Sequence, residues 1–171
     1  VIKDLGNLYQ AIEDINTAKN YYQKAIEINS SYAPALTNLG SIELNNGNQE
    51  KALSLLIQAT ESDPLLVPAW INLANAYLKF NELDKAEISY RKSIEINPNI
   101  FNSHFFLSSI LIEQNRLQEA EQSLRKTIKL NPNLAEAHSN LGAIMKDLGQ
   151  LEEAELSTRK AIKLKPHKPS G

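Results

Sequence analysis

The chain has 171 residues, of which 42% are hydrophobic, 22% charged and 6% aromatic, as is typical of a soluble globular protein. A net charge of −2 gives no basic field for nucleic acid or an anionic membrane, and the lack of cysteine excludes disulfides, thiolate zinc sites and a cysteine nucleophile. No apolar run approaches the roughly 18 residues of a membrane span, and the N-terminus has no signal-peptide pattern. We therefore predict a cytoplasmic location and no nucleic-acid or membrane partner.

The sequence repeats with a period of 34 residues. Three columns of residues share that spacing: Ala18, Ala52, Ala86, Ala120 and Ala154; Leu5, Leu39, Leu73, Leu107 and Leu141; and Pro64, Pro98, Pro132 and Pro166. A small residue, Gly, Ala or Ser, follows each leucine. Independent columns in one register indicate a genuine repeat, so the fold is expected to be built from five similar units.

Each repeat is predicted to hold two amphipathic helices. The first repeat, residues 1–32, lacks only its first two positions, and the complete repeats span 33–66, 67–100, 101–134 and 135–168. These repeats are predicted to form a single domain, 1–168, followed by a tail, 169–171. In the repeat 67–100 the apolar residues recur at helical spacing in both halves. They are Trp70, Leu73, Ala74 and Tyr77 in the first half, and Ala86, Tyr90, Ile94 and Ile96 in the second.

The breaks between helices have residues that favour turns. Asn or Gly stands in the middle of most repeats, where a helix end often needs left-handed backbone. The proline near the end of a repeat stops a helix, because it lacks an N–H and disfavours helical geometry before it. No alternating strand pattern occurs, so the chain is predicted to be all-α. Because one helix pair cannot bury its apolar stripe alone, neighbouring pairs must cover it.

These columns resemble the pattern of the tetratricopeptide repeat (TPR) family over essentially the whole chain. The matching positions in one repeat are Trp70, Leu73, Ala74, Tyr77, Ala86, Tyr90, Ser93 and Pro98. Glu43 stands where the family prefers Tyr, and Thr127 and Thr158 also depart from the pattern, which affects local packing only. The resemblance implies a right-handed superhelical solenoid of antiparallel helix pairs. It also implies that first helices line a concave groove that binds a peptide or partner segment without catalysis.

No catalytic, metal or cofactor site is predicted. His104 and His138 occupy the column of Leu36 and Trp70, a packing position, and repeats about 10 Å apart would hold them too far from each other for a shared zinc ion. His167 is expected to be solvated. No phosphate-binding loop or nucleophile motif occurs. The carboxylates of the second helices alternate with Lys and Arg, which favours ordinary pairing on a solvated face.

Asparagines recur at one first-helix position expected to face the groove. Asn38, Asn72 and Asn140 share this column, which Asp4 and Phe106 interrupt. An amide can pair with a peptide backbone regardless of peptide sequence, so the column predicts a ladder along an extended ligand, although a merely polar helix face remains open. The ladder resembles the repeat region of O-linked N-acetylglucosamine transferases. The full candidate set of groove residues is Lys3, Asn7, Asn38, Asn72, Asn75, Lys79, Phe105, Phe106 and Asn140.

Two further interpretations of the groove stay open. Lys3, Asn7 and Asn38 match the carboxylate clamp of co-chaperones, but Pro68 and Asn72 stand where that clamp needs basic residues. The phenylalanines at 105 and 106 are either an aromatic anchor for an apolar ligand side chain or inter-helix packing.

Three functions are compatible with these features. The first is a non-catalytic scaffold that binds a protein or peptide, and the second is the substrate-recruiting arm of a larger enzyme, such as a glycosyltransferase. The third is self-association, because the chain starts within a repeat and no polar capping helix follows the last one. The face expected to be open lies around Leu156, Ile162 and Leu164.

Overall fold

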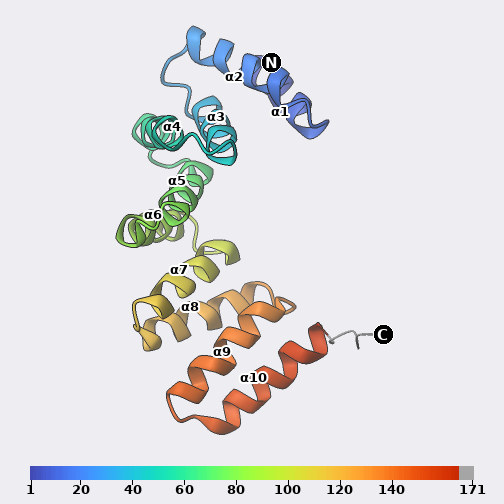
Figure 1. Cartoon of the computed structure of the whole chain (residues 1–171), viewed down its shortest axis with the longest axis vertical. Helices are drawn as coiled ribbons and strands as arrows, with labels where there is room; N and C mark the ends of the chain where they lie inside the picture. The colour runs from blue at the N-terminus through green and yellow to red at the C-terminus, as the bar shows by residue number, and fades with distance from the viewer. Residues whose placement is uncertain (166–171) are drawn as a thin grey trace. The chain divides into compact units, whose positions relative to one another are not determined.

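The computed structural model describes residues 1–165, and all the regular elements in this range are α-helices. These ten helices, labelled in Figure 1, are α1 (Ile2–Ala11), α2 (Ile15–Ile28), α3 (Ala33–Asn45), α4 (Gln49–Ser62), α5 (Val67–Lys79), α6 (Leu83–Ile96), α7 (Phe101–Glu113), α8 (Leu117–Leu130), α9 (Ala135–Asp147) and α10 (Leu151–Leu164). Consecutive helices form five pairs, one per 34-residue repeat. The predicted all-α helical-repeat solenoid is confirmed. The tail 169–171 and His167 lie outside the described residues.

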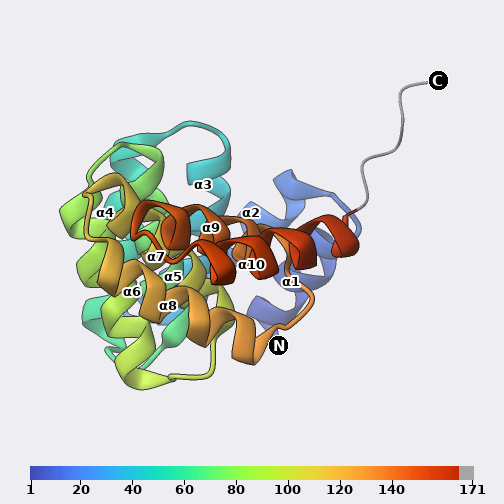
Figure 2. The same ribbon diagram turned by 90° about the horizontal axis from the view of Figure 1, so that it is seen from below.

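The helices fall into two compact units. The first unit, Val1–Ile96, contains α1 to α6, and in it α3 contacts α2, α4 and α5. The second unit begins at Asn97 and contains α7 to α10, with α9 in contact with both α8 and α10. Figure 2 shows α10 running alongside α9 in the second unit. Each pair is thus covered by its neighbour, as the 34-residue period requires.

The turn inside each pair has the same backbone geometry in all five repeats. One residue of each turn has a positive φ: Glu13, Gly47, Asn81, Asn115 and Gly149, with values between 58° and 80°. The N–H that follows closes the turn on a first-helix carbonyl, for example Asn48 N to Glu43 O at 2.9 Å. Since Gly and Asn adopt left-handed backbone at low cost, they explain four of these helix breaks, and Glu13 takes the same position in the first repeat.

Prolines set the other helix boundaries. The helices α4, α6 and α8 each end two residues before a proline, at Ser62, Ile96 and Leu130. Pro34 and Pro68 stand within the first two positions of α3 and α5, where a missing N–H removes no helical hydrogen bond. Three repeat boundaries therefore follow from proline chemistry, whereas α2 ends at Ile28 with Ser30 in the proline column.

Small residues let the two helices of a pair approach closely. A Cβ added to Gly40 would lie 2.8 Å from Cγ of Leu56, and one added to Gly6 would lie 2.6 Å from the ring of Tyr22. The alanines of the repeat column are at most 7% exposed, and Leu39, Leu73, Leu107 and Leu141 at most 5%. The packing predicted from the columns is confirmed. In the second helix of the third pair, Ile94 and Ile96 are only half-buried, because they lie in its last turn.

Candidate functional site

A hydrogen-bonded polar cluster joins α1 to α3 in the first unit. The Asn38 side chain donates from Nδ2 to Oδ1 of Asn7 at 2.8 Å. Lys3 donates to Asp4 at 2.9 Å, and this hydrogen bond to the carboxylate raises the pKa of Lys3. Two predicted groove residues, Asn7 and Asn38, are thus brought together, while Lys3 pairs with its sequence neighbour, and each of the three already has a partner within the chain.

Two tyrosines of the second helices reach asparagines of the first helices. The Tyr22 hydroxyl lies 2.8 Å from Oδ1 of Asn7, and the Tyr90 hydroxyl lies 2.5 Å from Oδ1 of Asn75. Both tyrosines are fully buried. Sequence reasoning treated tyrosine in this column as packing only. The available signal was that asparagine and tyrosine occur together, at the same separation of 15 residues, in the first and third repeats.

The remaining predicted residues of the first unit lie on α5. Lys79 donates from Nζ to the backbone carbonyl of Leu44 at 2.7 Å, so its ammonium group ties α5 to α3. Asn72 is half-buried, and within residues 1–165 its side chain has no hydrogen bond. Of the groove amides of this unit, Asn72 thus keeps its full hydrogen-bonding capacity.

In the second unit the predicted residues lie on α7 and α9. The rings of Phe105 and Phe106 make an edge-to-face pair with centroids 5.6 Å apart and an interplanar angle of 64°. Both rings are half-buried, so they pack against the protein and still offer apolar surface. Asn140 on α9 is also half-buried, and its amide makes no hydrogen bond to any other described residue.

The histidine column binds backbone carbonyls. The Nε2 atoms of His104 and His138 lie 3.0 and 2.9 Å from the carbonyl oxygens of Pro98 and Pro132. Trp70 makes the same contact, from Nε1 to the carbonyl of the proline six residues earlier, at 2.9 Å. Burial lowers the pKa of His104. The column is a packing position, as predicted, and the part of the chain that the structure describes has no cluster of three or more potential metal ligands.

One carboxylate is fully buried. Glu43 on α3 has 0% exposure, and its Oε1 lies 3.0 Å from Nζ of both Lys19 on α2 and Lys51 on α4. Asn48 donates to its other oxygen at 2.6 Å. Burial alone would raise the pKa of Glu43, but the bonds from Asn48, Lys19 and Lys51 together lower it to about 2. The group therefore connects the first two repeats as an ionised, paired carboxylate.

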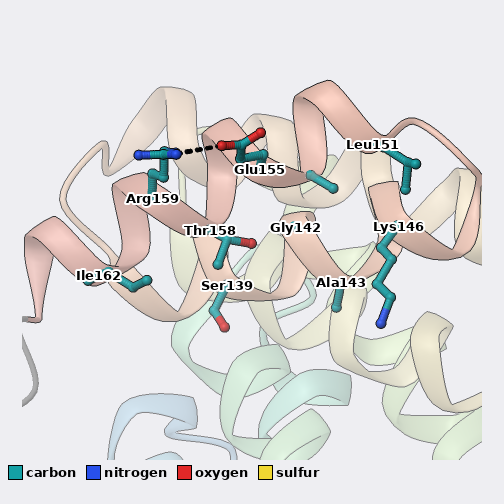
Figure 3. Close-up of a pocket in the computed structure, with 10 residues that line it drawn as sticks. Ser139, Gly142, Ala143, Lys146, Leu151, Glu155, Thr158, Arg159 and Ile162 are labelled. Carbon is teal, nitrogen blue, oxygen red and sulfur yellow. Dashed lines mark hydrogen bonds and ion pairs between the residues drawn. The ribbon is translucent and has the colours of Figure 1, made fainter.

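A hollow of about 740 Å³ opens on α9 and α10 (Figure 3). Ser139 and Thr158 lie near its middle, Lys146 and Leu151 at one end, and Ile162 at the other. Of the residues predicted for the open face, Ile162 lines the hollow, whereas Leu164 and the 69% exposed Leu156 do not.

The hollow corresponds to a face that is covered elsewhere in the chain. In the second repeat, Leu53 and Leu56 hold the positions equivalent to Glu155 and Thr158, and they pack against Leu73 of α5. The hollow is therefore equivalent to the face of the second repeat against which α5 packs.

Charged residues of the second helices pair with one another. Arg125 lies 2.8 Å from Glu121 one turn earlier and 2.7 Å from Glu153 on α10. Arg159 lies 2.6 Å from Glu155, the pair drawn in Figure 3. This pairing agrees with a solvated helix face.

The family model described as the cilia and flagella-associated protein 70 C-terminal domain, a TPR domain, matches residues 1–170. The chain belongs to this TPR family. A comparison with curated proteins finds no match. No helix within residues 1–165 is long and apolar enough to cross a membrane.

Solved structures of TPR proteins have the same fold as this member of the family. A crystal structure of MamA is 20% identical, with a TM-score of 0.83 and 93% of each chain covered. YrrB, described as a TPR protein with an unusual peptide-binding site, is 22% identical, with a TM-score of 0.81, 96% of this chain and 85% of that chain covered. PilF of Pseudomonas aeruginosa is 19% identical, with a TM-score of 0.87 and coverage of 98% and 76%. These likenesses describe the fold.

Proposed function

We propose that the chain is a non-catalytic module that binds an extended peptide or partner segment along its first helices. TPR-type domains are in general protein-interaction modules without catalysis. The observation that carries the proposal is the row of accessible amides in the first unit, formed by Asn7, Asn38, Asn72 and Asn75. Each amide can bond to a peptide backbone whatever its side chains. A cytoplasmic location and a single domain over 1–168 stay predictions.

The carboxylate clamp is the less favourable interpretation of the same surface. Lys3 already pairs with Asp4, which compensates its charge, and α5 offers Pro68 and Asn72 where a clamp needs cations. The surface thus favours a neutral backbone over a terminal carboxylate.

A titration with a blocked peptide tests the proposal. The probe is an uncharged peptide of Gly, Ser and Val, acetylated and amidated, followed by two-dimensional NMR of the side-chain amides. We expect shifts of the Asn7, Asn38, Asn72 and Asn75 signals, little dependence on salt, and no gain in affinity when the peptide has a free C-terminus. Binding that requires a free carboxylate would support the clamp instead. If no first-helix amide responds, the proposed function is wrong.

Self-association is a second proposal, favoured by the hollow on α9 and α10. Leu151 and Ile162, which line it, are 66% and 60% exposed. We expect light scattering to report growing assemblies as concentration rises, and Ile162→Glu to suppress them. Leu156→Glu is the matched control, because Leu156 is exposed outside the hollow. A chain that stays monomeric, or equal effects of the two variants, would contradict the proposal.

A further inference from the structure

The short contact between Tyr90 and Asn75 fixes which atom of the amide faces inward. A separation of 2.5 Å falls in the range of O–H···O hydrogen bonds, whereas N–H···O bonds are longer, at about 2.7 to 3.2 Å. The phenol on α6 therefore donates, and the amide oxygen on α5 accepts. Burial raises the pKa of Tyr90, so its hydroxyl keeps the proton that it donates.

Asn7 is held in the same orientation by Asn38 and Tyr22. The Nδ2 group of Asn38 donates to Oδ1 of Asn7 at 2.8 Å. The Tyr22 hydroxyl, also 2.8 Å from this oxygen, shares its one proton with Oε1 of Gln10 at the same distance. If the Asn7 amide were rotated by 180°, its own N–H groups would face the N–H group of Asn38, and no hydrogen bond could form between them. The oxygen of Asn7 is therefore committed to the protein interior.

An amide whose oxygen is held inward has only its nitrogen to offer a ligand. Oxygen and nitrogen lie on opposite edges of one planar group, and the nitrogen carries two donors and no acceptor. Asn7 is exposed and Asn75 is half-buried, so both NH₂ groups have access to solvent. Asn72 differs from Asn7 and Asn75, because no hydrogen bond within the described chain restrains the orientation of its amide.

The pairing alternates along the repeats. The first and third repeats carry Asn7 with Tyr22 and Asn75 with Tyr90. The second repeat instead has Ser41 and Leu56 at the two equivalent positions, which cannot make this hydrogen bond. Within the first unit the oriented donors thus recur at every second helix pair.

We propose that Tyr22 and Tyr90 are positioning residues that hold the NH₂ groups of Asn7 and Asn75 outward as donors. The first unit then recognises hydrogen-bond acceptors, namely backbone carbonyl oxygens of an extended partner, at alternate helix pairs. This inference rests on the proposed function, because it assigns the role of hydrogen-bond donor to amides of the same surface.

Asn75→Asp is the decisive variant. An aspartate has the same shape and still accepts from Tyr90, so the fold is retained, but the atom facing the ligand changes from a donor to an acceptor. We expect the affinity for the blocked Gly/Ser/Val peptide to fall roughly fivefold to tenfold. Asn20→Asp, at an exposed position on α2, adds the same charge away from the amides and is expected to bind like the parent.

Tyr90→Phe tests the positioning step itself. The ring still fills its site, but the Asn75 amide loses its fixed partner and can rotate. We expect ¹⁵N relaxation to report a more mobile Asn75 NH₂ group in the free protein, together with a fall in peptide affinity of about two- to threefold. A purely structural role for Tyr90 would lower stability and leave peptide affinity unchanged.

The outcomes separate this inference from the proposed function. Binding by the parent, with weaker binding by the Asn75→Asp and Tyr90→Phe variants, supports both. If the parent and Asn75→Asp bind the peptide equally well, or the Asn75 NH₂ group is as mobile in the parent as in Tyr90→Phe, the donor assignment is wrong while the proposed function stands. If the parent binds no peptide, the proposed function fails and the inference fails with it.

Discussion

Replacing Glu43 by Gln is expected to lower the free energy of unfolding by about 2 to 3 kcal/mol at neutral pH. The pKa of this carboxylate is about 2 in the folded chain and about 4.5 ordinarily. A difference of about 2.5 units corresponds to about 3 kcal/mol of stabilisation of the ionised form. Since Lys19 and Lys51 keep side-chain exposures of 30% and 56%, they can turn to solvent, so little further cost is expected.

The effect has a defined pH window. Because the folded-state pKa lies below the unfolded one, the carboxylate contributes its full stabilisation above about pH 4.5 and loses it as the pH falls towards about 2. Parent and variant should therefore differ most near pH 7 and converge near pH 2. Urea unfolding at neutral, mildly acidic and strongly acidic pH measures this convergence.

A matched control isolates the role of burial. Glu61→Gln removes an exposed carboxylate from α4 and is expected to change stability very little. If Glu43→Gln is as stable as the parent at pH 7, the cost of burying the charge cancels the ion pairs, which is common for buried pairs.

The fold could be predicted from the sequence because packing imposes local rules in each repeat. Three of these rules are detectable as columns in the sequence: a small residue that packs against Leu56 or Tyr22, a residue with left-handed backbone at the turn, and a proline after the second helix. These constraints involve neighbours at fixed separations, so their spacing predicts the helix pairs.

The chemistry of individual side chains was less predictable. Glu43 departs from the tyrosine column, and the sequence indicated only a local packing change there. The ionised state of the Glu43 carboxylate depends on contacts from one lysine of α2 and one of α4. No rule of sequence spacing specifies that these two lysines meet the same carboxylate. For the same reason, the sequence predicted Lys79 as a ligand residue and did not predict its hydrogen bond to the carbonyl of Leu44.

Replacing Asn38, Asn72 and Asn140 together by Ala is expected to weaken binding of the blocked peptide by about 2 to 4 kcal/mol, or about one net hydrogen bond each. Stability should fall only slightly, because of the three only Asn38 has a hydrogen bond within residues 1–165, to Asn7. Isothermal titration calorimetry and urea unfolding of the same samples separate the two effects.

The single variants separate effects on peptide affinity from effects on stability. Asn72→Ala and Asn140→Ala remove amides that no described residue binds, so each should lower affinity without lowering stability. Asn38→Ala should lower both, because it also removes the Nδ2 group that donates to the oxygen of Asn7. Salt should matter little, since Lys3 pairs with Asp4 and Lys79 binds a carbonyl. If the triple variant binds the peptide as tightly as the parent, the asparagine column is only a polar helix face.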